Sequence, residues 1–539
     1  MPTLDWIGKK AVVNHHREVP FHILKEDESL SFGKRDSGNL IVEGDNLVAL
    51  KALLPYYKGK VKCIYIDPPY NTGEEKWVYN DNVNSPEIKK WLGQVVGKEM
   101  EDLSRHDKWL CMMYPRLSLL KEFLSDDGVI YISIDDNEAC RLKLLCDEIF
   151  GDDAFIAQIP WRKRTAKADV PFGISQDFES IFAYAKTSKF RAAIEGKERK
   201  YFETPDFPNR PWRIHDLTSQ RTAEERPNSY FTIVNPKNGK KYPASELRTW
   251  ALTAETFEKY YAENKIVFPD DYDFLNIQKP AFRYWKDDDI KKANGFFGLT
   301  SVSTNLPKEV GMTQDGTKEI TELFGKKIFN FPKPSSLISY LIKIATYSNK
   351  DSLILDSFAG SGTTAQAVLE LNKEDGGNRK FILCEMLPQV AEPITRERAK
   401  RVIERDGLQE QTGFKFAKLG EPIYSADGDI NPNIKYADLA RHVFFMATGT
   451  PLAYRKQEFK TPLVGISNGV AIYLLYNGIL GDDSVNGGNR LTQKVLKSLP
   501  KHDGVKIIYG TACGLSESVL RKSNIVFRQI PYSIFERQV

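Results

Sequence analysis

The chain has 539 residues, of which 41% are apolar and 27% charged, and its formal net charge is +4. One hydrophobic core rarely extends over this length, so we expect two to four domains of ordinary soluble composition. No apolar run reaches the roughly 20 residues of a membrane helix and residues 1–10 lack a secretory signal, so we expect a cytoplasmic protein without membrane contact. The six cysteines form no C-x-x-C pair, which argues against disulfides and zinc, and we expect no metal.

The first part of the chain alternates predicted strands and helices. Residues 39–42 and 60–67 are apolar, β-rich runs, and the second run stops at two consecutive prolines, which neither a strand nor a helix continues through. Further along, residues 108–124 are typical of a helix, 128–134 of a strand and 138–150 of a helix. This alternation predicts a mainly parallel sheet covered on both faces.

Residues 187–330 break this alternation, because they are rich in proline, asparagine, aspartate and aromatic residues, with short strand-like pieces such as 230–234. A structureless stretch of this length is uncommon inside a compact domain, so we predict an inserted domain. The α/β pattern then resumes. It predicts a strand at 352–356, a helix at 363–372, a strand at 380–384, paired strands within 464–477, and a β-α-β unit from 504 to 529 with its helix near 515–522.

Asp67-Pro68-Pro69-Tyr70 directly follows the strand at 60–67. The amino group of a nucleobase is a poor nucleophile because its lone pair is conjugated with the ring. A carboxylate (Asp67) and a carbonyl (Pro68) that accept both amino hydrogens would favour a pyramidal nitrogen, and Tyr70 offers a ring face to an extruded base. The stiff Pro68-Pro69 pair adds no competing N–H donor. The motif thus indicates methylation of an amino group, although a rigid turn that only caps a strand explains the same residues.

A glycine-rich loop, residues 356–364, lies between a predicted strand and a predicted helix. Its glycines allow a ligand to approach the backbone, and the helix N-terminus attracts a carboxylate such as that of a methionine moiety. No lysine follows the glycines, which disfavours a triphosphate loop. Glu385 ends the next strand, at the spacing of an acidic residue that binds ribose hydroxyls. A glycine turn needed only for packing is the alternative. The predicted cofactor-binding residues here are Asp356, Phe358, Ala359, Gly360, Gly362, Thr363 and Glu385.

Three weaker patterns accompany these motifs. Asp45 and Asn46 follow the strand at 39–42, where Asp45 either accepts from the adenine amino group of a cofactor or caps a helix. Lys333 and Ser335 precede an apolar helix and are expected to line the cofactor pocket, unless Pro334 simply begins that helix. The third pattern is expected to contact nucleic acid, with a solvated basic loop as its alternative, and consists of Trp161, Arg162, Lys163 and Arg164.

The Asp67 turn and the Gly360 turn are far apart in the chain, but parallel sheets bind ligands beyond the carboxyl ends of neighbouring strands. We therefore expect both turns to open onto one cleft. With the motifs in this order, the chain resembles class β amino-methyltransferases and, more narrowly, the modification (Mod) subunit of type III restriction–modification systems. The segments that carry this resemblance are 39–47, 65–73, 128–136, 333–337, 358–364, 369–378, 210–213 and 216–218.

The resemblance implies an α/β fold with a Rossmann-like, circularly permuted sheet that uses S-adenosylmethionine. It also implies an inserted target-recognition domain and a C-terminal α/β domain. The expected domains are an N-terminal arm (1–38), the catalytic half of the methyltransferase domain (39–186), the target-recognition domain (187–330), the cofactor-binding half (331–424) and the C-terminal domain (425–539).

The activity that the resemblance implies is site-specific methylation of the 6-amino group of adenine in double-stranded DNA. It further implies DNA contacts by Arg210, Trp212 and Arg213, a homodimer, and an ATP-dependent restriction (Res) subunit on a separate chain. The chain is short for a type III subunit, so an orphan methylase stays open, as do RNA methylation and a catalytically silent DNA-binding subunit. Cytosine 4-amino methylation uses the same chemistry and is disfavoured by the Asp before Pro-Pro-Tyr, whereas cytosine carbon-5 methylation is excluded because no Pro-Cys occurs.

Overall fold

The computed structural model describes residues 4–72, 104–165, 173–425, 427–452, 459–476, 479 and 488–531. The chain divides into two compact units, of which the larger comprises Met1–Ala192 with Val302–Val539 and the smaller Ala193–Ser301. Within the described residues, no helix combines the length and the apolar character needed to cross a membrane.

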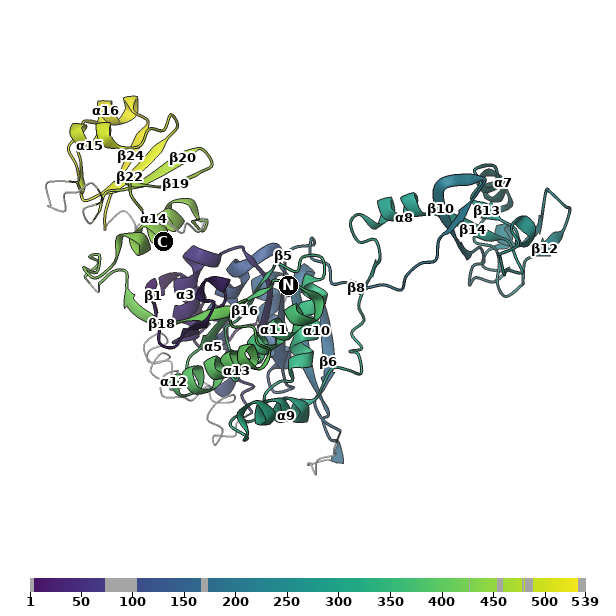
Figure 1. Cartoon of the computed structure of the whole chain (residues 1–539), viewed down its shortest axis with the longest axis horizontal. Helices are drawn as coiled ribbons and strands as arrows, with labels where there is room; N and C mark the ends of the chain where they lie inside the picture. Colours follow the sequence, from purple (N-terminus) through teal and green to yellow (C-terminus); the bar gives the residue numbers. More distant parts are fainter. Residues whose placement is uncertain are drawn as a thin grey trace. The chain divides into compact units, whose positions relative to one another are not determined.

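The larger unit is built on a ten-stranded sheet (Figure 1). Its strands are β1 (His22–Glu26), β2 (Phe32–Gly33), β3 (Leu40–Glu43), β4 (Val61–Ile66), β5 (Leu124–Ile134), β6 (Phe155–Arg162), β7 (Phe178–Ala185), β16 (Leu353–Asp356), β17 (Lys380–Glu385) and β18 (Gly413–Pro422). The central strands β18, β3, β17, β16, β4 and β5 run parallel, as the alternating pattern predicts. Strands β1 and β2 at one edge and β7 and β6 at the other are antiparallel to their neighbours.

The spatial order of the strands is β1-β18-β3-β17-β16-β4-β5-β7-β6. From β4 the chain builds the sheet toward β5, and from β16 it builds toward β17, so the strand order reverses between β4 and β16. Two strands differ from the expected division of the chain. The first is β3, which lies between β17 and β18, and the second is β1, which belongs to the sheet although we expected residues 1–38 to form an arm.

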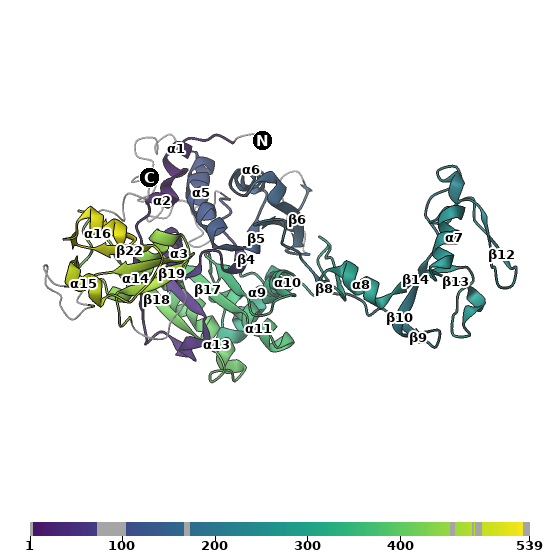
Figure 2. The same ribbon diagram turned by 90° about the horizontal axis from the view of Figure 1, so that it is seen from above.

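Helices cover both faces of the sheet, and Figure 2 shows one group of helices on each face. One face carries α3 (Asn46–Tyr57), α5 (Arg105–Phe123) and α6 (Ala139–Phe150), with the short α1 (Lys9–Val12) and α2 (His15–Glu18) against α5. The other face carries α9 (Thr313–Phe324), α10 (Ser335–Thr346), α11 (Thr363–Asp375), α12 (Pro388–Val390) and α13 (Glu397–Arg405). Ile320 of α9 is buried against Phe329 and Val390, so this part of the predicted insertion belongs to the larger unit.

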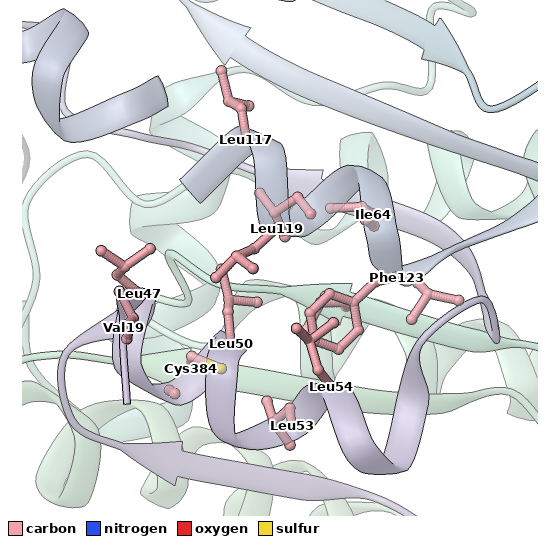
Figure 3. Packing of buried hydrophobic residues seen from close by; sticks show 14 of the residues in the cluster. Val19, Leu47, Leu50, Leu53, Leu54, Ile64, Leu117, Leu119, Phe123 and Cys384 are labelled. Atoms are coloured by element: carbon pink, nitrogen blue, oxygen red, sulfur yellow. The ribbon is translucent and has the colours of Figure 1, made fainter. Parts of the chain in front are cut away.

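The core between α3, α5 and the sheet consists of interlocking aliphatic and aromatic side chains (Figure 3). Leu50 and Leu54 of α3 pack toward Leu119 and Phe123 of α5 and toward Ile64 of β4, and all five are buried. Burying a side chain of this kind contributes about 1.5–3 kcal/mol. This packing fixes the carboxyl end of β4, where the first chemical motif begins.

The smaller unit contains its own apolar clusters and its own sheet, ordered β13-β14-β10-β9. Its elements are β8 (Ile194–Glu195), β9 (Phe202–Thr204), β10 (Phe207–Asp216), β11 (Thr232–Val234), β12 (Lys241–Pro243), α7 (Ala254–Ala262), β13 (Ile266–Val267), β14 (Ala281–Trp285), α8 (Lys286–Ala293) and β15 (Leu299–Thr300). Strand β8 pairs with β15, so the two ends of the unit lie side by side.

The last segment of the larger unit holds a four-stranded sheet, ordered β19-β20-β22-β24, and confirms the predicted β-α-β unit. Strands β22 and β24 are parallel neighbours, and α16 connects them. The elements are α14 (Tyr436–Thr448), β19 (Leu463–Ser467), β20 (Val470–Leu474), β21 (Arg490–Leu491), α15 (Gln493–Ser498), β22 (Lys506–Gly510), β23 (Ala512–Cys513), α16 (Glu517–Lys522) and β24 (Ile525–Gln529).

Candidate active site

The Asp67-Pro68-Pro69-Tyr70 turn leaves the carboxyl end of β4 and is held from outside by two elements. The indole N–H of Trp109, on α5, donates to the Pro69 carbonyl at 2.6 Å. Asn71, with φ of 57°, donates to the buried carboxylate of Glu138. Among the described residues, none donates a hydrogen bond to the Pro68 carbonyl. The turn therefore presents one carboxylate and one available carbonyl in a fixed geometry.

Asp67 lies in a compact network of charges. Lys333 donates to both of its carboxylate oxygens at 2.8 Å, and the Tyr70 hydroxyl donates to Oδ1 at 2.8 Å. Glu179, on β7, lies 3.1 Å from the Tyr70 hydroxyl oxygen and 3.5 Å from the Lys333 ammonium. Burial raises the pKa of Asp67 above its usual range, although Lys333 favours the charged form. The pKa of Lys333 is lowered by burial but raised more by Asp67 and Glu179, so the ammonium keeps its charge.

The glycine loop leaves β16, which pairs directly with β4. Gly360 and Gly362 have φ of 53° and 77°, values that glycine adopts without strain. A Cβ on Gly362 would also lie 2.8 Å from the carbonyl oxygen of Thr395. Beneath the loop, Asp356 accepts from the backbone N–H of Phe358 at 3.0 Å and from the Thr364 hydroxyl. Burial raises the pKa of Asp356 to about 7.

The two turns meet at adjoining cavities. One cavity is lined by Asp67 and Lys333 together with Asp356, Phe358, Ala359, Gly360 and Thr363. The second shares Asp67 and Phe358 with the first and extends to Asn46, Ser357 and Glu385. The carboxylate turn and the glycine turn thus open onto one continuous site at the point where the strand order reverses, which is where open α/β sheets bind ligands.

The residues around the second cavity supply polar groups to a ligand. Glu385 is 3% exposed and accepts from the backbone N–H groups of Gly360 and Leu387, both at 2.9 Å. The Ser357 hydroxyl is buried and has no hydrogen-bond partner among the described residues. A buried polar group without a partner is costly, and a ligand that bonds to it would remove that cost.

Asp45 caps the N-terminus of α3, which is one of the two roles that the sequence pattern allowed. Its Oδ1 accepts from the backbone N–H groups of Leu47 and Val48 at the start of α3, and its Oδ2 lies 3.1 Å from the Arg116 guanidinium. Asn46 donates to the carbonyl of Ser357 at 3.2 Å and lines the second cavity. Of this pair, the structure brings Asn46 to the site.

Lys333 and Ser335 contact different parts of the structure. Lys333 reaches Asp67, whereas the backbone N–H of Ser335 donates to the Glu319 carboxylate on α9. Ser335 lines a different hollow, between α9, α11 and α13. Ser335 therefore lines neither of the two cavities at Asp67, because the first turn of α10 directs this residue toward α9.

Two tryptophans expected at a nucleic-acid surface are core residues. Trp161 is 2% exposed and donates to the Gly311 carbonyl at 2.9 Å. Trp212 is fully buried and donates to the Thr204 hydroxyl at 2.9 Å. Both side chains were expected to be exposed because their neighbours in the sequence are polar. Burying their large apolar area is the more favourable arrangement. Trp161 nevertheless lies near the site, since its ring centroid is 5.5 Å from the Lys333 ammonium.

The cations expected to meet nucleic acid are mostly ion-paired. Lys163 and Arg164 are partnered by Glu179 at 3.2 Å and Asp177 at 3.6 Å, and Arg162 is exposed. In the smaller unit, Arg210 lies 3.2 Å from Asp287 and Arg213 lies 2.6 Å from Asp289. Four of the predicted cations therefore have a carboxylate partner within 4 Å.

Glu179 is a residue of the site that the sequence motifs did not indicate. The signal was present, because Glu179 is the one charged residue in the otherwise apolar or small-polar strand Phe178–Ala185. A lone charge in a buried strand requires a partner, and its partners, Lys163 and Lys333, come from other elements. Among the described residues, no group of three or more histidine, cysteine, aspartate or glutamate side chains is arranged to hold a metal ion.

Comparison with known proteins agrees with this geometry. A family model described as DNA methylase, for N6 and N4 enzymes, matches residues 61–396, from β4 to the helices beyond the glycine loop. The StyLTI Mod subunit of a type III restriction–modification enzyme from Salmonella typhimurium is 31% identical over 85% of this chain and 71% of its own length. The corresponding EcoPI Mod subunit of Escherichia phage P1 is 31% identical over 82% and 74%.

A shorter relative has the same identity. The type II methyltransferase M.KpnI of Klebsiella pneumoniae is 31% identical over 76% of this chain and 93% of its own length. The match thus includes enzymes of two restriction–modification classes. The chain belongs to the DNA methylase family of N6 and N4 amino-methyltransferases, and within it to the group that contains the type III Mod subunits.

Proposed function

We propose that this enzyme methylates the 6-amino group of an adenine that is extruded from double-stranded DNA into the cavity at Asp67. One observation carries the proposal: the Asp67 carboxylate and the loop at Gly360, which we assign to the cofactor, line the same cavity. An amino group at Asp67 would therefore meet its methyl donor directly. Cytosine 4-amino methylation is the second candidate, and the Asp before Pro-Pro-Tyr favours adenine.

The methyl donor is S-adenosylmethionine, which supplies an electrophilic methyl group on a sulfonium. We assign its adenosine to the cavity of Asn46, Ser357 and Glu385, where the buried carboxylate suits ribose hydroxyls and the Ser357 hydroxyl requires a partner. We assign its carboxylate to the N-terminus of α11, a helix of 13 residues that begins at Thr363.

The chain's own groups then prepare the target nitrogen. Asp67 accepts one amino hydrogen and the Pro68 carbonyl accepts the other, which localises the nitrogen lone pair and directs it at the methyl group. The ring of Tyr70, with its hydroxyl on Asp67, offers a face to the extruded base. Transfer is direct, without a covalent enzyme intermediate. In agreement, burial raises the pKa of Cys63, on β4, to about 12, so this thiol is not an activated nucleophile.

DNA recognition is assigned to the smaller unit, Ala193–Ser301, which lies between the two motifs and within the range of the family match. We further propose that the chain acts as a homodimer and as the modification subunit beside a separate ATP-dependent restriction subunit. The similarity to the StyLTI and EcoPI Mod subunits supports this assignment. A methylase without a restriction partner is the alternative, and M.KpnI, a type II methyltransferase, is similarly related.

The test measures transfer of tritiated methyl groups from S-adenosylmethionine to unmethylated plasmid DNA, with the same assay on RNA. Asp67→Ala should lower the rate by a factor on the order of 100 or more, while calorimetry shows near-normal binding of S-adenosylhomocysteine. Asp127→Ala is the matched control, because Asp127 is a partly exposed carboxylate paired with Lys62 and distant from the cavities. Wild-type turnover by Asp67→Ala would reject the role of Asp67.

Base identity follows from modified-base sequencing of DNA from cells that express the chain. Modified adenine at one sequence motif supports the proposal, and modified cytosine would replace it with the second candidate. Label in RNA alone would overturn DNA as the substrate. DNA binding without incorporation of label would identify a catalytically silent subunit.

A further inference from the structure

The Lys333 ammonium makes more contacts in the site than neutralising the charge of Asp67 would require. It donates to Asp67 Oδ1 and Oδ2 at 2.8 Å each and to the Tyr70 hydroxyl at 2.7 Å. It also lies near two aromatic rings, 5.0 Å from the centroid of Tyr70, at the hydroxyl end of that ring, and 5.5 Å from the centroid of Trp161. The Lys333 side chain is only 8% exposed, so these contacts replace water almost completely.

These are the contacts that a target amino group would require under the proposed function. An entering base must place a nitrogen donor on the Asp67 carboxylate and lay its ring against Tyr70. The ammonium nitrogen occupies the first of these positions: it bonds both Asp67 oxygens, and Tyr70 adds a third hydrogen bond on Oδ1, so only one of the roughly four acceptor sites of the carboxylate is left. An amino group that approaches Asp67 therefore competes with the Lys333 ammonium for the same carboxylate.

We propose that Lys333 is a positioning residue that mimics the target amino group and yields to it. In this inference, which rests on the proposed function, the ammonium holds Asp67 ionised and in place until an extruded base arrives. It then leaves Asp67 for Glu179. The pair thus acts as a gate that only a correctly presented amino group opens.

Glu179 is suited to receive the ammonium. Its Oε2 lies 3.5 Å from Lys333 Nζ, so a small rotation of the lysine side chain completes the contact. The other oxygen, Oε1, is already paired with Lys163 at 3.2 Å, which fixes the orientation of the carboxylate. A buried cation that lost Asp67 without a second carboxylate would pay a large desolvation cost, and Glu179 removes that cost.

The backbone at Lys333 confines the movement to the side chain. Gly316, on α9, packs so tightly that a Cβ there would lie 2.2 Å from the Pro332 carbonyl oxygen and 2.8 Å from the Lys333 carbonyl carbon. On the other side, the Thr363 hydroxyl donates to the Lys333 carbonyl at 3.2 Å. The lysine is anchored between α9 and α11, and its flexible four-carbon stem supplies the reach between the two carboxylates.

The test is a double-variant cycle in the full chain, with initial rates of methyl transfer measured against DNA and against S-adenosylmethionine. Glu179→Gln deprives the ammonium of its second partner, so Lys333 should remain on Asp67. We expect kcat/KM for DNA to fall about tenfold, while KM for S-adenosylmethionine stays at the wild-type value. Lys333→Met combined with Glu179→Gln should recover most of this loss at alkaline pH, because loss of the cation raises the pKa of the buried Asp67 carboxyl further.

If Lys333 and Glu179 had only structural roles, the two substitutions would lower kcat/KM additively or more than additively. The double variant would then not recover activity. Lys62→Met is the matched control: the Lys62 side chain is 9% exposed and ion-paired with Asp127 at 2.7 Å, outside the site. It should leave both kinetic constants unchanged. A double variant no better than Glu179→Gln would overturn the gate, as would a Glu179→Gln enzyme with wild-type kinetics. A raised KM for S-adenosylmethionine in Lys333→Met would overturn it too, by assigning Lys333 to the cofactor.

Circular dichroism and S-adenosylhomocysteine binding establish that each variant is folded. If Lys333→Met does not fold, Lys333→Arg takes its place, because a guanidinium keeps the charge and binds both Asp67 oxygens in a fixed fork. We then expect a fall of about tenfold in kcat/KM for DNA with an unchanged KM for the cofactor, and wild-type kinetics would overturn the gate. Absence of transfer by the wild-type chain would overturn the proposed function and the gate together, whereas an active wild-type chain with contrary variants overturns the gate alone.

Discussion

Asp356 lies under the glycine loop with its carboxyl group buried, and burial raises its pKa to about 7 from 3.8. The folded chain therefore holds this proton more tightly than the unfolded chain does. As the pH rises from about 4 to about 7, the unfolded state gains the charged form first, and the free energy of unfolding falls. Asp356→Asn removes this titration and should flatten the pH dependence by up to about 4 kcal/mol across that interval.

Urea denaturation of both chains without cofactor, at several pH values from about 4 to about 8, measures the effect. The wild-type minus variant difference cancels the titration of groups that do not interact with Asp356, such as Asp135, whose pKa burial raises to about 6. Parallel curves for the two chains would show that Asp356 does not titrate in this interval.

Among individual residues, the sequence predicted those whose role follows from the neighbouring sequence. Asp67 and Gly360 could be assigned because a carboxylate followed by two prolines, and glycines between a strand and a helix, carry their chemistry in adjacent positions. Glu179 and the true place of Lys333 could not, because their pairing arises where β7 and the segment before α10 meet in space. Asp45 was ambiguous for a related reason, since the same oxygen can cap a helix or bind a ligand.

Helix α5 positions the catalytic turn through one indole. Trp109 is fully buried, and its N–H donates to the Pro69 carbonyl at 2.6 Å. Trp109→Phe keeps most of the packing but leaves that carbonyl without its donor. We expect a loss of about 1–3 kcal/mol in the free energy of unfolding, and a lower kcat because the Asp67 carboxylate is held less firmly.

Chemical denaturation and methyl-transfer kinetics measure the two effects. Trp6→Phe is the matched control, because Trp6 is also buried but donates to the Cys111 sulfur, a weak acceptor, rather than to the catalytic turn. It should leave kcat near the wild-type value. A Trp109→Phe enzyme with wild-type kcat would show that the turn is stable without α5.

Most strands and helices with regular periodicity were predicted within a few residues of their observed bounds. Strand β24 (Ile525–Gln529) ends at the residue where the predicted β-α-β unit ends, and β4 and α11 differ from their predictions only at the ends. What periodicity cannot give is the neighbour of each strand. The position of β3 between β17 and β18, and of β1 at the edge, depends on long-range pairing, and so does the attachment of α9 to the larger unit.

The two compact units of the chain permit a prediction for the whole molecule. The smaller unit, Ala193–Ser301, encloses its own apolar clusters, and its first and last strands, β8 and β15, are hydrogen-bonded to each other. Paired strands lie about 5 Å apart, so a short turn can join them and replace residues 196–298. The shortened chain should fold and bind S-adenosylhomocysteine like the wild type, because the cavities at Asp67 and Glu385 are built only from the larger unit.

The same shortened chain should lose methyl transfer to DNA at the recognition sequence, since the assigned recognition unit is absent. Calorimetry measures cofactor binding, and modified-base sequencing measures residual methylation. The excised fragment, residues 193–301, should unfold cooperatively on its own and bind DNA with an affinity that falls as salt rises. Methylation of the original sequence by the shortened chain would place recognition in the larger unit, and loss of cofactor binding would show that the two units fold only together.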